Sequence, residues 1–276
     1  MTNMIELQKT SDRARELMVD ALIGAGCGHP GGAFSSIDMM TALFFEEMKI
    51  DPLNPKWEER DRFILSKGHS SVGLYAIMHL RGFFSKDVLM TFRQDNSILA
   101  GHPDMNKVPG VEMSTGSLGH GLSVGVGYAL AAKMDRKPFR TFVMVGDGES
   151  QEGSVWEAAM SASHFKLDNL IAIVDRNRFQ IDGPTEDIMS LEPYKQKWDA
   201  FGWQVREING NEMGEIVSTL KEIPFSTGKP SLIISNTIKG KGISFMENKA
   251  EWHGKALKGE QAELARLEIR KKLESY

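Results

Sequence analysis

The two glycines around Asp147, in the stretch Gly146-Asp147-Gly148, constrain this chain more than any other feature. The preceding run, residues 141–145, is apolar and β-branched and predicts a buried strand, and a helical pattern begins at Val155. Asp147 should therefore lie at the carboxyl end of a strand, where doubly wound sheets bind their ligands. The glycines permit a sharp turn and a close approach of the backbone to a ligand.

A second strand, predicted at residues 170–174, brings Asn177 to the same edge of the sheet. A carboxylate, an amide oxygen and a backbone carbonyl are hard oxygen ligands, suited to Mg²⁺ or Ca²⁺ beside a phosphate. A lone Gly-Asp-Gly is more often an ordinary turn. The order strand, Gly-Asp-Gly, helix, strand and Asn favours a ligand site over a turn.

Composition and charge argue against several classes of protein. The 276 residues carry a net charge of −4, so nothing global suggests binding to nucleic acid or to an anionic membrane. The single Cys27 excludes an internal disulfide and fits a reducing compartment. The N-terminal segment has no hydrophobic signal core, and no apolar run is long enough to span a bilayer. We therefore expect a cytoplasmic protein that binds neither nucleic acid nor membrane.

Strands and helices alternate along the rest of the chain. Further strands are predicted at 62–65, 203–205 and 231–234, and helices at 5–25, 37–48, 71–80, 122–133, 213–222 and 260–273. A glycine-rich break at 24–32 precedes the second helix, with Ser36 as its expected cap. The alternation predicts an α/β fold with a mostly parallel sheet flanked by helices. No long linker or repeat divides the chain, so we expect one domain over 1–276, with a C-terminal loop and helix at 236–276.

Five of the seven histidines stand beside a glycine: His29, His69, His102, His120 and His253. Any one of them alone is more often a structural or exposed residue. Their repetition in separate loops favours imidazoles on closely approachable backbone, suited to binding phosphate and moving protons. Their spacing lacks a compact zinc pattern such as His-Glu-x-x-His, which disfavours a transition-metal site.

The residues around these histidines, in the order in which they occur, resemble the transketolase family. The matching stretches are 28–32 (GHPGG), 61–69 (DRFILSKGH), 101–103 (GHP), 115–119 (TGSLG) and 252–254 (WHG). The Gly-Asp-Gly followed about thirty residues later by Asn177 likewise resembles the thiamine diphosphate signature. The resemblance spans nearly the whole chain and implies the thiamin-diphosphate-binding fold, with thiamine diphosphate and Mg²⁺ (or Ca²⁺) as cofactors.

The resemblance also implies roles for individual residues. The metal ligands would be Asp147, Asn177 and the carbonyl of Phe179. The cofactor would be lined by His69, His102, Gly116, Ser117, Leu118, Gly148, Asn177, Lys239 and His253. The sugar would be contacted by His29, His102 and His253, which would shuttle protons. Glu152 and Glu157 match acidic residues that link paired cofactor sites across a subunit interface, against the alternative of a solvated helix face.

Two positions depart from the family pattern. Gly32 stands where some members carry a side chain near the cofactor, and His120 stands where Gln is frequent. The resemblance covers only the diphosphate-binding domain of that family. It therefore implies a second subunit, with the pyrimidine-binding and C-terminal domains, in an α2β2 heterotetramer whose active site lies between chains.

The implied reaction transfers a two-carbon ketol unit from a ketose or ketose phosphate to an aldose or aldose phosphate, as in the pentose phosphate pathway. Four alternatives stay open at this point. They are a split deoxyxylulose-phosphate synthase, a transketolase for an unusual sugar, the α subunit of a 2-oxo acid dehydrogenase, and a non-catalytic regulatory subunit. The intact Asp147 and Asn177 disfavour the last of these, and the Trp-His-Gly at 252–254 disfavours the dehydrogenase subunit.

Overall fold

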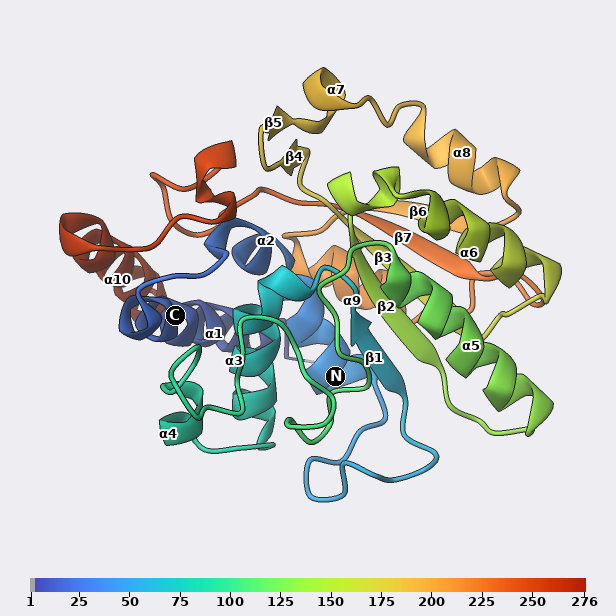
Figure 1. The fold of residues 1–276 in the computed structure, drawn as a ribbon, viewed down its shortest axis with the longest axis horizontal. Helices are drawn as coiled ribbons and strands as arrows, with labels where there is room; N and C mark the ends of the chain where they lie inside the picture. The colour runs from blue at the N-terminus through green and yellow to red at the C-terminus, as the bar shows by residue number, and fades with distance from the viewer. Residues whose placement is uncertain (1–2) are drawn as a thin grey trace.

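A parallel five-stranded sheet forms the centre of the protein in the computed structural model, which describes residues 3–276 (Figure 1). The strands are β1 (Arg62–Leu65), β2 (Thr141–Gly146), β3 (Leu170–Arg176), β7 (Ser231–Asn236) and β6 (Gln204–Asn209), in that spatial order. All neighbouring pairs in this sheet are parallel. The predicted α/β fold with a mostly parallel sheet is therefore confirmed.

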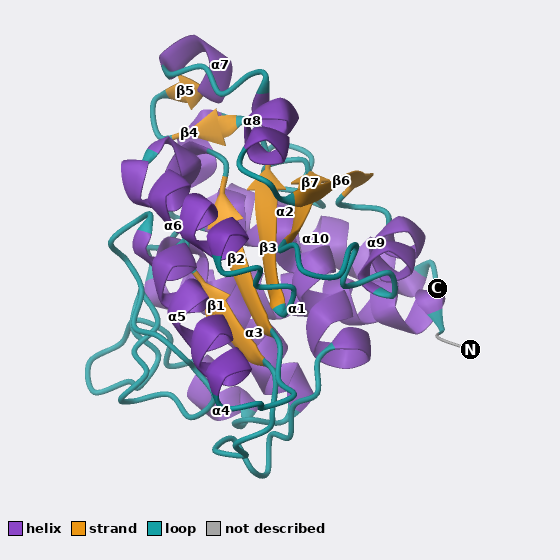
Figure 2. Cartoon of the chain, turned by 90° about the vertical axis from the view of Figure 1, so that its right-hand side faces the viewer, coloured by secondary structure: helices purple, strands orange, loops and turns teal. Residues whose placement is uncertain are grey.

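Helices cover both faces of the sheet, as Figure 2 shows. One face carries α1 (Met4–Ala25), α2 (Pro30–Ala42), α3 (Ser71–Arg81), α9 (Met213–Leu220) and α10 (Gly259–Glu274). The other carries α5 (His120–Met134), α6 (Gly153–His164) and α8 (Tyr194–Ala200). Along β2, Phe142 and Met144 pack into the first layer and Val143 and Val145 into the second. Burial on both faces is the reason that β2, β3 and β7 are largely continuous apolar runs, whereas the edge strand β6 alternates between buried and partly exposed residues.

The carboxyl ends of the strands meet at one edge, where the chemistry-bearing residues gather. The register pairs Gly146 of β2 with Asp175 of β3, so Asp147 and Asn177 follow neighbouring strands at the same level. A small hairpin of β4 (Phe179–Gln180) and β5 (Gly183–Pro184) follows β3, and the short helix α7 (Thr185–Ile188) continues from it at the top of Figure 1. The sequence patterns did not predict this hairpin, α7, α8 or the single turn α4 (Lys86–Leu89).

The start of the second helix was predicted wrongly. The sequence placed a break through Gly32 and a helix at 37–48 capped by Ser36, whereas α2 runs over Pro30–Ala42 with His29 at its N-cap and a π-helical turn, Leu43–Glu47, behind it. Proline suits the first turn of a helix. Gly31 lies in the first turn of this helix, where close packing leaves no room for a side chain. A Cβ there would lie 2.9 Å from the Trp252 carbonyl oxygen.

The other predicted helices agree with the structure to within two residues at each end. None of the helices in residues 3–276 is long and apolar enough to cross a membrane.

Candidate functional site

A cavity of about 230 Å³ opens at the carboxyl edge of the sheet. Its lining residues lie at or just after the ends of β1, β2 and β3, on the hairpin, on the 239–253 loop, in the first turn of α2 and in the 115–119 loop. They are Gly32, Lys67, His69, Leu118, Gly146, Asp147, Gly148, Glu149, Gln151, Glu152, Asn177, Phe179, Gln180, Ile181, Asp182, Lys239 and His253. Most of the residues predicted for the cofactor and the metal therefore line a single cavity.

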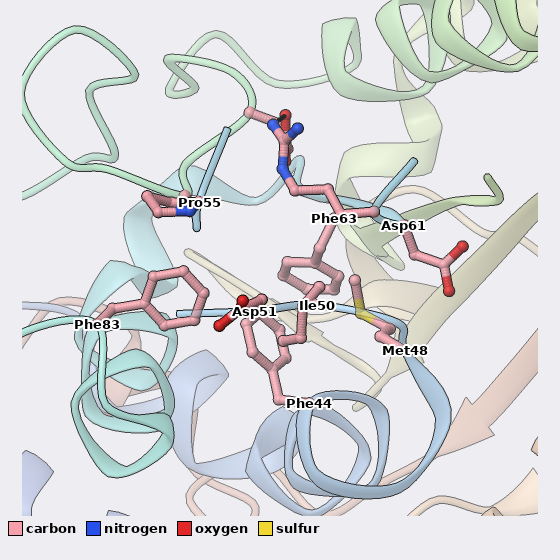
Figure 3. Close-up of a pocket in the computed structure, with 11 residues that line it drawn as sticks. Phe44, Met48, Ile50, Asp51, Pro55, Asp61, Phe63 and Phe83 are labelled. Carbon is pink, nitrogen blue, oxygen red and sulfur yellow. Dashed lines mark hydrogen bonds and ion pairs between the residues drawn. The ribbon is translucent and has the colours of Figure 1, made fainter. Parts of the chain in front are cut away.

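A second cavity lies beside the amino end of β1 and is different in kind (Figure 3). Aromatic side chains, among them Phe44, Phe63 and Phe83, enclose only about 10 Å³, space for a single water molecule at most. A wider, open depression of about 610 Å³ beside β6 and β7 contains none of the predicted site residues. The cavity at the carboxyl edge is thus the one that combines room for a ligand with the expected side chains.

Asp147 directly follows β2, and its buried carboxylate is held in place by hydrogen bonds. Its Oδ1 accepts a hydrogen bond from Gly148 N at 2.8 Å, and its Oδ2 accepts one from Arg178 N at 2.6 Å and one from the Arg176 guanidinium at 3.2 Å. Burial, together with the charge of Asp175, raises the pKa of Asp147 to about 6, although Arg176 acts in the opposite direction. Near neutral pH the side chain is therefore an oriented carboxylate.

Asn177 and Phe179 contribute further oxygens to the same cavity. Asn177 Oδ1 accepts a hydrogen bond from Phe179 N at 3.1 Å, and the Phe179 carbonyl lies 3.5 Å from Lys239 Nζ. The described residues contain no cluster of three His, Cys, Asp or Glu side chains arranged as metal ligands. A metal in this cavity would therefore need amide and carbonyl oxygens in addition to the carboxylate.

Lys239 is a buried cation without a carboxylate partner. The residue is 1% exposed, and its Nζ contacts the Phe179 carbonyl and, at 3.4 Å, His253 Nδ1. Among the described residues, no carboxylate oxygen lies within ion-pairing distance of this ammonium. Burial lowers its pKa to about 8, although Asp147 and Asp175 oppose the change. A buried charge needs a counter-charge, and the cavity is where an anion would provide it.

Four imidazoles gather beside this cation. The centroid of the His29 ring lies 5.3 Å from that of His69, 5.7 Å from that of His253 and 6.2 Å from that of His102. The centroids of the His69 and His253 rings are 4.9 Å apart. Residues from four distant parts of the chain thus form one cluster. His120, the fifth histidine of the pattern, is instead exposed on the first turn of α5.

Burial lowers the pKa of each clustered histidine. It brings the pKa of His29 to about 4 and that of His253 to about 3, and it places the pKa of His69 well below the usual value. The pKa of His102 falls for the same reason, helped by the charge of Arg93. The four rings are therefore neutral near pH 7 and able to accept protons as well as donate hydrogen bonds. His29 Nδ1 is buried without a hydrogen-bond partner among the described residues, which leaves it free for a ligand.

The remaining predicted residues lie at the open side of the site. Gly116 and Ser117 are exposed, and a Cβ on Gly116 would lie 3.2 Å from His102 Cδ2, so this backbone passes close over the imidazole. Glu152 precedes α6 as its N-cap, and Glu157 lies one turn into that helix. Both carboxylates face solvent in the single chain.

Sequence reasoning missed the buried charges that support the cavity. Glu149 accepts hydrogen bonds from Ser66 Oγ, from Gly119 N at 2.9 Å and from Gly146 N at 2.9 Å, so it ties the end of β1 and the 115–119 loop to the Gly-Asp-Gly turn. Lys67 and Asp175 form another buried pair at 2.6 Å. The one signal in the sequence is that Lys67 and Asp175 stand at the ends of apolar strand patterns, and nothing in those patterns indicates that the two residues pair.

The comparison with protein families decides what this site belongs to. Residues 7–273 match the family described as the transketolase, thiamine diphosphate binding domain. This chain belongs to that family. The fold and the family that the sequence patterns indicated are thereby confirmed, and the transketolase class of enzyme with them.

Two transketolase subunits match this chain over nearly their whole length, and a solved transketolase matches it over part of its length. The chain is 49% identical to a subunit of the apulose-4-phosphate transketolase of Phocaeicola vulgatus, covering 98% of this chain and 95% of that one. It is 46% identical to 6-deoxy-6-sulfo-D-fructose transketolase subunit SqwG of a Clostridium species, covering 97% of each chain. The solved transketolase of Campylobacter jejuni superposes with a TM-score of 0.91 at 34% identity, covering 98% of this chain. The chain spans only 43% of the length of that solved transketolase.

Proposed function

We propose that this chain is the diphosphate-binding subunit of a two-chain transketolase that transfers a two-carbon ketol unit from a ketose to an aldose. The proposal rests on how much of each relative this chain matches. The chain matches relatives named as transketolase subunits from end to end, but it spans less than half of a solved transketolase chain. The chain acts in this proposal as one domain, and a partner with the pyrimidine-binding and C-terminal domains supplies the rest of the active site.

The cofactor pair in this proposal is thiamine diphosphate with Mg²⁺ or Ca²⁺. Asp147, Asn177 and the carbonyl of Phe179 would hold the metal, since hard cations prefer such oxygens. The diphosphate would rest against Gly148, with Lys239 and the histidines around it. The unpaired buried ammonium of Lys239 supports this arrangement, because a diphosphate would give it the counter-charge that the protein does not.

Thiamine diphosphate, when bound, supplies the electron sink for carbon–carbon bond cleavage. This chain supplies bases and hydrogen-bond donors around it. His29, His102 and His253 are proposed to bind the hydroxyls of the sugar and to move protons between them and the reacting carbon atoms, a task that suits neutral imidazoles. His69, Gly116, Ser117 and Leu118 would shape the wall against the cofactor.

The ketose is proposed to carry an anionic group. The names of the two relatives specify a sugar phosphate and a sulfonated sugar, and neither names a substrate of the pentose phosphate pathway. An unusual anionic ketose is thus favoured over the pentose phosphates. We further propose that the protein is cytoplasmic and that it forms an α2β2 assembly. The exposed Glu152 and Glu157 would lie at the contact between two copies of this chain.

Two-carbon transfer tests the proposal directly. The chain is assayed alone and with its co-expressed partner, in the presence of thiamine diphosphate and Mg²⁺, with apulose 4-phosphate, 6-deoxy-6-sulfofructose and xylulose 5-phosphate as donors. Transfer in the mixture alone, from one of the first two donors, is the expected result. Transfer by this chain alone would contradict the split active site, and cofactor binding without any transfer would point to a different reaction.

A further inference from the structure

Asp175 is a buried carboxylate that accepts four hydrogen bonds. Its Oδ2 accepts from Lys67 Nζ at 2.6 Å, from Ser35 Oγ at 2.6 Å and from Asn177 Nδ2 at 2.8 Å. Its Oδ1 accepts from Thr237 Oγ1 at 2.5 Å. With four donors in place, this carboxylate has no free direction toward the cavity and does not line it.

The donors come from four different segments of the chain. Ser35 lies in α2, Lys67 follows β1, Asn177 follows β3 and Thr237 follows β7. Lys67 also donates to the Gly32 carbonyl at 2.7 Å, which ties α2 to the same network. The carboxylate therefore holds the edge of the sheet together at one point.

The contact with Asn177 is the one with a chemical consequence. An amide has a donor end and an acceptor end, and the two exchange places when the group turns over. Because Nδ2 of Asn177 is held by Asp175, Oδ1 must face the other way, toward the cavity and the Phe179 N–H at 3.1 Å. Without Asp175, the single hydrogen bond from Phe179 N would be left to specify which end faces the cavity.

We propose that Asp175 is a positioning residue that orients the Asn177 amide oxygen into the cavity and thereby sets the affinity of the site for a divalent cation. This inference rests on the proposed metal role of Asn177. Partners that orient a ligand's side chain typically change metal affinity by about 10–100-fold when they are removed. Among the described residues, none of the four clustered imidazoles donates a hydrogen bond to Asp175.

The test is a Mg²⁺ titration of the full chain, free and with its partner, at fixed thiamine diphosphate, followed by tryptophan fluorescence and calorimetry. Asp175→Ala is expected to raise the Mg²⁺ dissociation constant about 10–100-fold. The matched control is Asp61→Ala. Asp61 is equally buried and accepts from Lys49 N at 3.0 Å and from the Arg140 guanidinium at 2.7 Å, but it lies before β1, at the opposite end of the sheet. The Asp61→Ala variant should be less stable than the wild type but should bind Mg²⁺ with unchanged affinity.

A milder variant decides the matter if Asp175→Ala does not fold. Thr237→Val keeps the shape of the side chain and removes the hydrogen bond to Asp175 Oδ1, so the carboxylate can rotate. One hydrogen bond corresponds to a change of about fivefold in Mg²⁺ affinity. Excess Mg²⁺ should restore transfer by the two-chain enzyme for both variants, which a general loss of folding would not allow.

The outcomes separate the inference from the function on which it rests. Wild-type affinity for Mg²⁺ in the folded variants, Thr237→Val included, would overturn the role of Asp175 and leave the proposed function intact. Wild-type protein that binds thiamine diphosphate equally with and without Mg²⁺ would overturn the metal site itself. An equal loss of affinity in Asp61→Ala would show that the effect is one of stability.

Discussion

Replacing Lys239 by methionine should have opposite effects on stability and on cofactor binding. The ammonium is 1% exposed and contacts a carbonyl and an imidazole rather than a carboxylate. Methionine keeps the length and the packing of the side chain but carries no charge. The variant should therefore fold more stably than the wild type when no cofactor is bound, and should bind thiamine diphosphate more weakly.

The size of the stability effect follows from the pKa. Burial lowers the pKa of Lys239 from 10.5 to about 8. The unfolded chain thus takes up its proton at a higher pH than the native protein, so native stability falls as the pH drops from 10.5 to 8 and stays lowered below that. At 1.36 kcal/mol per pKa unit, the buried charge costs roughly 3 kcal/mol near pH 7. This figure sets the scale of the gain in Lys239→Met, and it already includes the loss of the attraction to Asp147 and Asp175.

The effect on binding has the other sign. A hydrogen bond to a charged group is worth about 1.5–3 kcal/mol, so the variant should bind thiamine diphosphate about 10–150-fold more weakly. Affinity for thiamine, which carries no phosphate, should change little.

Thermal and urea unfolding of the cofactor-free chain measure the first effect, and calorimetry with thiamine diphosphate and with thiamine measures the second. The matched control is Lys241→Met, since Lys241 lies on the same loop but pairs with Glu247 at 3.5 Å on the surface. A variant that is less stable than the wild type without cofactor would refute the reasoning about the unpaired charge. An equal loss of affinity for thiamine and for its diphosphate would refute the assignment of Lys239 to the phosphates.

Three further changes test other parts of the structure. Gly31→Ala places a methyl group 2.9 Å from the backbone of the 239–254 loop, and this overpacking, at about 1–3 kcal/mol, should weaken thiamine diphosphate binding in calorimetry. Arg15→Met removes the cation that pairs with Asp38 at 2.7 Å and with Asp12 at 2.8 Å. Asp12 keeps Lys272 at 2.9 Å, but Asp38 loses its ion-pair partner while buried, which should cost about 3–5 kcal/mol in urea unfolding. Because burial lowers the pKa of His29 to about 4, native stability should fall as the pH drops from 6.5 to 4. His29→Gln should reduce this pH dependence in urea unfolding.

The architecture could be predicted from the sequence because most strands of the central sheet are apolar runs and the long helices carry apolar residues at helical spacing. The error at the start of α2 has a specific cause. Gly31 and Gly32 resemble a break when only neighbouring residues are considered, but at Gly31 the side chain of Lys239 and the backbone of Trp252 fill the space that a Cβ would need. Contacts between residues about 200 positions apart decided a local conformation, and a local pattern contains no information about them.

The functional site, like the fold, could be predicted from the sequence only in part. The stretches around the histidines indicated which residues to expect, but the neutral state of the four imidazoles follows from their burial beside Lys239, which only the fold shows. The pair of Lys67 and Asp175 joins the ends of β1 and β3, two strands with β2 between them. Each residue alone resembles an ordinary charged strand end, so the pair was not predicted.

The distribution of burial in the site gives a physical reason for a second chain. The groups proposed to hold the diphosphate and its metal, Asp147, Asn177 and Lys239, are buried within this chain and need no partner to be held in place. Gly116 and Ser117, proposed to form part of the wall against the cofactor, are exposed. A thiamine diphosphate bound here would be enclosed at its charged end and open to water at its organic end. Exclusion of water strengthens the electrostatic interactions of an active site, so the surface around Gly116 and Ser117 is where the partner of the proposed two-chain enzyme would cover the cofactor.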